Sequence, residues 1–129
     1  MKTFKDFLLE FRTEAGHRQL LTRQLQNRVQ LTGRNSELGA QERRLLTRAR
    51  MQALRELLQA SQSRWDVMNE EFEALLKRCG ATAEEQTVLR QYYGEAMTDP
   101  EIAAMMGRSP KTVYYHRTRW LRRVEAGQQ

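Results

Sequence analysis

The residues best suited to chemistry lie near the carboxyl end, where positions 111–123 hold five basic residues and no acidic one. Lysine, arginine, tyrosine and hydroxyl side chains of this kind donate hydrogen bonds to phosphate oxygens and to base edges. The residues that we expect to reach base edges are Lys111, Tyr114, Tyr115 and Thr118. Those that we expect at the phosphate backbone are Ser109, Arg117, Arg119, Arg122 and Arg123, and Thr112 is a further residue that we expect at the DNA-binding surface. The segment therefore predicts a surface that contacts nucleic acid.

Two short helices joined by a tight turn would position these side chains. Thr98 has the type and place of a cap for a helix over 99–106, which has an acid and a proline in its first turn. Gly107 can supply the positive φ of the turn, and Ser109 can cap the second helix. The residues expected to share one small core are Val88, Leu89, Tyr92, Ile102, Met106, Val113, His116 and Trp120. This pattern predicts a helix-turn-helix.

A further helix is predicted before that pair. Thr82 and Glu85 have the spacing of a capping box, and Gly94 would end the helix that they open. Positions 84–101 hold five acidic residues and one basic residue, so this part of the chain is polarised. Such polarity is expected if one face meets phosphates. A basic surface helix inside a bundle that binds nothing is the alternative.

The segment YYGEAMTDPEIAAMMGRSPKTVYYHRTRWLRRV resembles the C-terminal helix-turn-helix of sigma factors, the region-four module, and is similar to the DNA-binding domain of LuxR-type regulators. The likeness rests on Glu-Ile-Ala, the Gly107 turn, Ser-Pro-Lys-Thr-Val and the arginine-rich helix, over the last third of the chain. LuxR-type sequences have a histidine at the place of His116, which supports a packing role for it.

The arm that precedes this module adds a second likeness. A long helical arm before a region-four-like module resembles small phage-encoded regulators of the RinA and ArpU kind. These resemblances imply promoter DNA binding, phage or prophage origin and, for sigma-like modules, contact with RNA polymerase. Nothing resembles the sigma region that melts DNA, so a complete primary sigma factor is not expected.

The amino-terminal part predicts two long helices, over 3–31 and 37–79, joined by loop residues 32–36. Gly80 would end the second helix, and Ser61-Gln62-Ser63 can bend it. Its apolar stripe, with the alternating steps of a coiled-coil seam, is Leu54, Leu58, Ser61, Trp65, Met68, Phe72, Leu75 and Cys79. We therefore expect an all-α chain: a coiled-coil-like helical hairpin over 1–79 and a helix-turn-helix domain of three to four helices over 80–129. We also expect a homodimer.

Arginine is concentrated in the predicted hairpin. Nine arginines and only two acidic residues lie between Arg18 and Arg55. These arginines either contact phosphates or form an ordinary solvated helix surface with scattered ion pairs. Because the nine do not share one helical face, we favour the solvated surface.

Composition excludes several classes of protein. The chain has 129 residues and a net charge of +6, which favours an anionic partner. Its one cysteine, Cys79, ends an apolar stripe and is expected to pack, and His17 has no neighbours with metal-site spacing. No catalytic motif is present, so we expect no enzyme, cofactor or metal. No apolar run is long enough to span a membrane, and the reducing cytoplasm is the expected location.

These patterns together predict a small sequence-specific DNA-binding transcription regulator, whose arm serves dimerisation or polymerase contact. Two alternatives stay open. A phage DNA-packaging adaptor of the terminase small-subunit type also joins a helix-turn-helix to oligomerising helices, and would have the mass of a ring. A helical protein-interaction module would bind no duplex at low salt.

Overall fold

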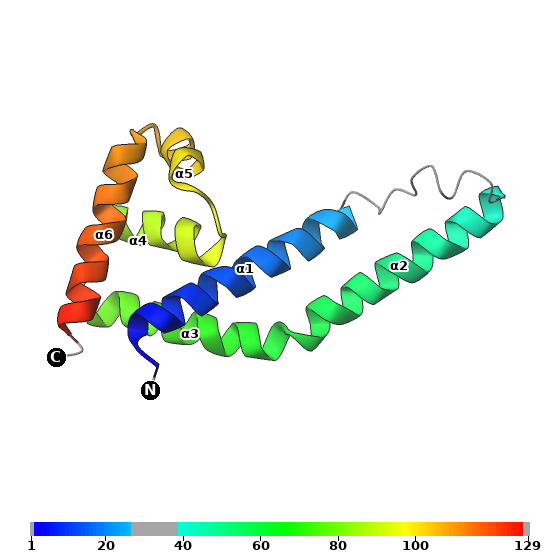
Figure 1. Cartoon of the computed structure of the whole chain (residues 1–129), viewed down its shortest axis with the longest axis horizontal. Helices are drawn as coiled ribbons and strands as arrows, with labels where there is room; N and C mark the ends of the chain where they lie inside the picture. The colour runs from blue at the N-terminus through cyan, green and yellow to red at the C-terminus, as the bar shows by residue number, and fades with distance from the viewer. Residues whose placement is uncertain (1, 27–38, 128–129) are drawn as a thin grey trace. The chain divides into compact units, whose positions relative to one another are not determined.

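The computed structural model describes residues 2–26 and 39–127, in which every regular element is a helix (Figure 1). The elements are α1 Phe4–Gln26, α2 Ala40–Ala60, α3 Gln62–Arg78, α4 Ala83–Leu89, the π-helical segment η2 Arg90–Gly94, α5 Asp99–Met106 and α6 Pro110–Ala126. The predicted all-α class is confirmed. Among the described residues, no helix combines the length and the apolar character needed to cross a bilayer.

The long second helix predicted over 37–79 is interrupted at Ser61, one of the residues expected to bend it. The Ser61 hydroxyl donates to the Leu58 carbonyl at 3.1 Å, and Arg18 donates to the same carbonyl at 3.2 Å. Side chains thus satisfy a carbonyl at the end of α2. The predicted stop at Gly80 is confirmed, because α3 ends at Arg78 and Gly80, two residues later, has a φ of 59°. The predicted helix over 27–31, the loop 32–36 and the start at 37 lie outside the described residues.

The chain divides into two compact units, one made of residues 1–16 and 65–129 and the other of residues 17–64. This division differs from the boundary at 79/80 that the sequence suggested. The physical reason is the main core of the first unit, which joins residues from both sides of that boundary. Its buried members are Leu8, Phe11, Met68, Phe72, Leu75, Leu76, Leu89, Tyr93, Trp120 and Val124.

Aromatic rings hold the first part of α1 in this core. The Phe11 ring stacks on Trp65 and on Phe72, with 4.7 Å between ring centroids in both cases. Burial of one such side chain stabilises a fold by about 1.5–3 kcal/mol. Cys79 is partly buried and packs against the same cluster, as predicted for a packing residue.

A smaller core lies where α4, α5 and α6 meet. Its buried members are Val88, Ile102, Ala103 and Val113, with Tyr92, Met97 and Met106 packed against them. Most of the predicted core is therefore present, but Leu89 and Trp120 belong to the main core instead. His116 is only partly buried, and its Nε2 lies 3.6 Å from a carboxylate oxygen of Glu84 at the edge of the helix pair.

The second unit is held by weaker apolar packing. Leu21 of α1 is buried, but no residue of α2 is. Leu45 and Leu57 of α2 are both more than half exposed. The side chains of α2 therefore face solvent to a larger extent than those of α3 or α6, which each contain buried residues.

Candidate nucleic-acid interface

The connection between α5 and α6 has the local structure that the sequence predicts. Thr98 and Glu101 form a reciprocal capping box at the start of α5, and Gly107 ends the helix with a φ of 66°. Ser109 caps α6 by accepting from the Thr112 amide at 3.2 Å. A residue with a side chain would be strained at the Gly107 dihedral angles, which explains the glycine. These caps fix where α6 begins and hence which of its residues face outward.

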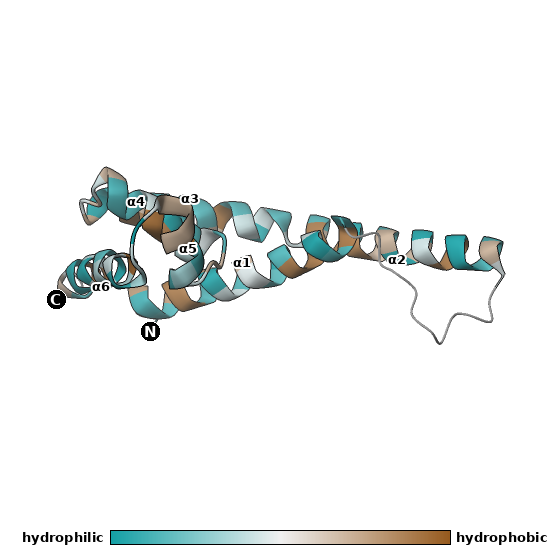
Figure 2. Ribbon diagram, turned by 90° about the horizontal axis from the view of Figure 1, so that it is seen from above, coloured by the Kyte–Doolittle hydropathy of each residue, from teal (hydrophilic) through white to brown (hydrophobic). Residues whose placement is uncertain are grey.

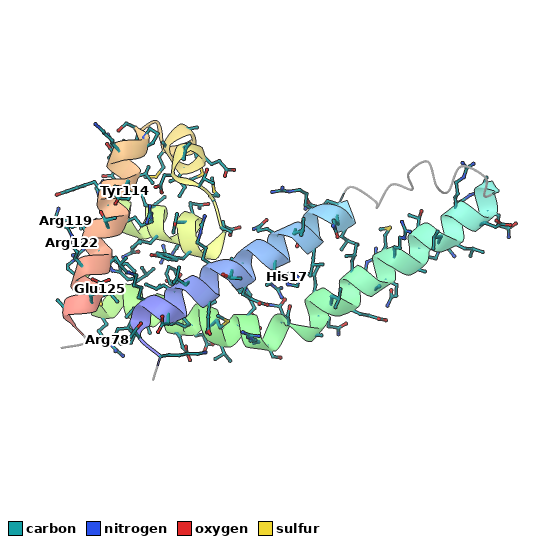
Figure 3. The ribbon with its side chains drawn as sticks, in the orientation of Figure 1. His17, Arg78, Tyr114, Arg119, Arg122 and Glu125 are labelled. Carbon is teal, nitrogen blue, oxygen red and sulfur yellow. The ribbon has the colours of Figure 1, made fainter. Side chains whose placement is uncertain are left out.

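Four long side chains line the exposed side of α6. Lys111, Tyr115, Arg119 and Arg122 follow one another at steps of four, four and three residues, and all four are exposed. At about 100° per residue they fall within an arc of roughly 80°, opposite the buried side of the helix. We call these four residues the α6 stripe. Figure 3 shows Arg119 and Arg122 on the side of α6 that faces away from α4, and Figure 2 shows mainly hydrophilic residues along this helix.

The stripe combines positive charge with exposed aromatic surface. Tyr115 is 56% exposed, and Tyr114 beside the stripe is exposed to the same extent. The Arg119 guanidinium lies 5.9 Å from the centre of the Tyr115 ring, within the range of a cation–π contact. No acidic residue belongs to the stripe, which spans about 16 Å along the helix axis.

The three predicted hydroxyl donors are engaged within α6 and its cap. The Ser109 and Thr112 hydroxyls hydrogen-bond each other at 2.9 Å. The Thr118 hydroxyl donates to the Tyr114 carbonyl at 2.9 Å, and Thr118 is partly buried. The structure therefore places these residues beside the stripe, in helix capping and intrahelical bonds.

Arg117 does not lie with the stripe, contrary to its predicted place among the backbone contacts. Its guanidinium donates to both carboxylate oxygens of Asp99, at 3.2 and 2.8 Å, and stacks over the Tyr92 ring at 4.1 Å. Both side chains of the ion pair are less than one-fifth exposed. Burial is the largest effect and lowers the pKa of Arg117, but the hydrogen bonds to Asp99 and the electrostatic attraction of Asp99 and Tyr92 together raise it, so the net shift is upward and the group stays charged. Its role is to join α6 to the first turn of α5.

Arg123 is also engaged by groups of the protein instead of lying on the stripe. It donates to the two Glu85 carboxylate oxygens at 2.5 and 2.6 Å and to the Gly80 carbonyl at 3.1 Å. The Glu85 side chain is 3% exposed. Burial raises the pKa of Glu85, but hydrogen bonds from the Thr82 amide and from Arg123 outweigh it, and the net shift is downward. Arg123 thus joins α6 to the start of α4.

A third arginine supports the helix pair from α1, which the sequence did not predict. Arg12 donates to the Tyr92 and Met97 carbonyls, and its guanidinium lies 3.8 Å from the centre of the Tyr92 ring. Arg117 contacts the same ring. Tyr92 and the connection that follows it are therefore held by two cations from separate helices.

The geometry gives α6 a fixed inner side and an open cationic outer side. Ion pairs near its middle and near its end hold it to α5 and α4, and the exposed stripe needs no rearrangement to meet a ligand. Within the described residues, no group of histidine, cysteine and acidic side chains has the arrangement of a metal site. A stripe of this kind can donate to phosphate oxygens, stack on bases and read base edges.

Protein-family models, curated proteins and solved structures contain no match to this chain.

Proposed function

We propose that the protein is a sequence-specific DNA-binding transcription regulator that places α6 in the major groove of a duplex. In this proposal α5 and α6 are the two helices of a sigma-region-four-like helix-turn-helix. Lys111, Tyr114 and Tyr115 read base edges, while Arg119 and Arg122 bind phosphates. The observation that carries the proposal is the α6 stripe, which is exposed, positively charged and free of acidic residues.

The electrostatics of the surroundings support the same conclusion. Arg117 and Arg123 neutralise the carboxylates of Asp99 and Glu85, which would otherwise repel phosphates close to α6. Glu84 is likewise paired with Arg108, at 3.1 Å. The positive charges of α6 that no described carboxylate pairs with, those of Lys111, Arg119 and Arg122, therefore face outward.

The wider role follows from the sequence resemblance and belongs to the proposal. We propose that the regulator acts in the cytoplasm of a bacterial host, is phage or prophage encoded, binds DNA as a homodimer and can contact RNA polymerase.

A packaging adaptor of the terminase small-subunit type is a second candidate. Leu45 and Leu57 of α2 are both more than half exposed, and assembly into either a ring or a dimer would bury such residues. Light scattering separates the two, since the adaptor would have the mass of a ring and the regulator that of a dimer.

The proposed function is tested by measuring duplex binding at several salt concentrations. The double variant Arg119→Gln/Arg122→Gln should flatten the plot of log K against log salt by about 1.8, since each lost phosphate contact contributes about 0.9. At about 0.15 M salt, that change corresponds to roughly 30-fold weaker binding. The control Arg43→Gln/Arg50→Gln removes the same charge from α2. An equal loss of duplex affinity in both variants would mean that only the net charge of the protein matters, and would contradict a DNA site on α6.

A further inference from the structure

The helix α2 has an exposed side made only of arginine and glutamine. With the helix bounds known, three of its five arginines fall on this side. They lie within an arc of about 40°, and three glutamines extend the arc to about 80°, at about 100° per residue. These six residues, the α2 stripe, are Gln41, Arg44, Arg48, Gln52, Arg55 and Gln59, and all six are exposed. The two acids of α2, Glu42 and Glu56, fall outside the arc.

The positive charge of this stripe has no partner in the described part of the chain. Ion pairs on a helix form between residues three or four apart, and no acid stands at those distances from Arg44, Arg48 or Arg55. No described carboxylate from another helix pairs with them either. Arg44 and Arg48 are themselves four residues apart, a like-charge spacing that disfavours an isolated helix. An ordinary solvated helix surface would relieve this repulsion with acidic neighbours.

The composition of the stripe fits the phosphate backbone of DNA. All cations of α2 are arginines, whose planar guanidinium binds phosphate through two parallel hydrogen bonds. Glutamine side chains between them donate further hydrogen bonds to phosphate or sugar oxygens. From Arg44 to Arg55 the stripe measures about 16 Å, a length over which one DNA strand presents several phosphates, about one per 3.4 Å.

We infer that the α2 stripe is a second contact surface for the phosphate backbone of double-stranded DNA. This inference rests on the proposed function for its ligand, but it assigns α2 a role that the α6 site does not need. The stripe would add affinity without sequence preference, because phosphate contacts carry no sequence information. The arm would then do more than join two copies of the chain.

The test compares two double variants of the full chain that differ only in the side of α2 that they change. Arg48→Gln/Arg55→Gln removes two charges from the stripe, and Arg43→Gln/Arg50→Gln removes two charges from the other flank at the same spacing of seven residues. Arginine and glutamine have similar helix propensity, and circular dichroism checks that both variants keep the wild-type helix content. Binding of one duplex is measured at several salt concentrations.

The stripe variant should flatten the salt slope by about 1.8 and bind roughly 30-fold more weakly at about 0.15 M salt, while the control variant changes little. Equal slopes for the two α2 variants, with the α6 variant impaired, would overturn this inference and leave the proposed function standing. A loss confined to the stripe variant, with the α6 variant unimpaired, would support the stripe and overturn the α6 site. If the wild-type chain retains no duplex at low salt, both proposals fail.

Discussion

The ion pair between Arg123 and Glu85 makes a sharp prediction, because the neighbouring arginine is a matched control. Arg122 and Arg123 are adjacent in α6, but Arg122 is exposed on the stripe whereas Arg123 binds a carboxylate that is 3% exposed. Replacing each in turn with methionine keeps an unbranched side chain and the helix propensity while removing the charge. Arg123→Met leaves the Glu85 carboxylate buried with the Thr82 amide, at 2.9 Å, as its remaining partner.

The size of the effect follows from the burial of the two partners. Removing one partner of a buried ion pair costs about 3–5 kcal/mol. The Arg123 side chain is 38% exposed, so solvent screens part of the interaction. We therefore expect Arg123→Met to lower the free energy of unfolding by about 2–3 kcal/mol, and Arg122→Met to change it by less than about 0.5 kcal/mol.

Urea unfolding followed by circular dichroism measures the difference. The midpoint for Arg123→Met should fall by about 1–2 M, while that for Arg122→Met stays near the wild-type value. The pKa of Glu85 is lowered from 4.5, so the stability contributed by this pair is present above that pH and is lost as the pH falls through the lowered pKa. In Arg123→Met the loss should occur at higher pH. Equal midpoints for the two variants would refute the role given to Arg123.

Three further predictions concern single positions in the first unit. Burial raises the pKa of Tyr93 to about 12, so the neutral form stabilises the fold up to about pH 10 and that contribution is lost as the pH rises toward 12. The absorbance titration of wild type minus that of Tyr93→Phe should show this late ionisation; a difference curve centred near pH 10 would contradict it. Gly107→Ala meets no atom within 4 Å but imposes a φ of 66° on alanine, so it should destabilise by about 1 kcal/mol in urea unfolding; an unchanged midpoint would argue against strain at this turn. Ala96 has a φ of 56°, and Ala96→Gly should move the same midpoint upward by up to about 1 kcal/mol, whereas a clear loss would show that its side chain matters more than the relieved strain.

Local features of the fold could be predicted because each depends on neighbours a few residues apart. The caps at Thr82, Thr98 and Ser109, and the positive φ of Gly107, follow from residue types at fixed offsets and are all confirmed. The break at Ser61 was predicted only as a bend. A serine can be recognised in the sequence as a residue whose hydroxyl competes for backbone carbonyls. Arg18, which also binds at the end of α2, lies 43 residues from Ser61 and could not be recognised in this way.

The sequence alone does not show which arginines of α6 are held in ion pairs, because those pairs join residues far apart in the chain. Arg117 and Arg119 look equivalent in an arginine-rich segment, yet only Arg117 has an acid within reach, 18 residues earlier in the chain. Helical spacing alone indicates that Arg117 points toward the protein, because it lies on the same face as the buried Val113, Trp120 and Val124. The Arg123 pair joins residues 38 apart, which no local pattern reveals.

The division into units could not be predicted for the same reason. Two separate stripes of apolar residues, around Phe11 and around Phe72, each suggest a helix that needs a partner. Periodicity does not say which partner, and in the structure both stripes join one core with Tyr93, Trp120 and Val124 of the carboxyl-terminal part. The predicted boundary is set by Gly80, which ends the long helix, whereas the division in the structure is set by the core that residues on both sides of Gly80 share.

Selection of bound duplexes from a random pool, carried out at two salt concentrations, tests the central claim most directly. The wild-type chain should enrich one sequence motif, and Lys111→Ala/Tyr115→Ala should lose preference at particular positions of that motif while still retaining duplex at low salt. A pool that stays random for the wild-type chain, or a motif that the double variant reads unchanged, would contradict recognition by α6.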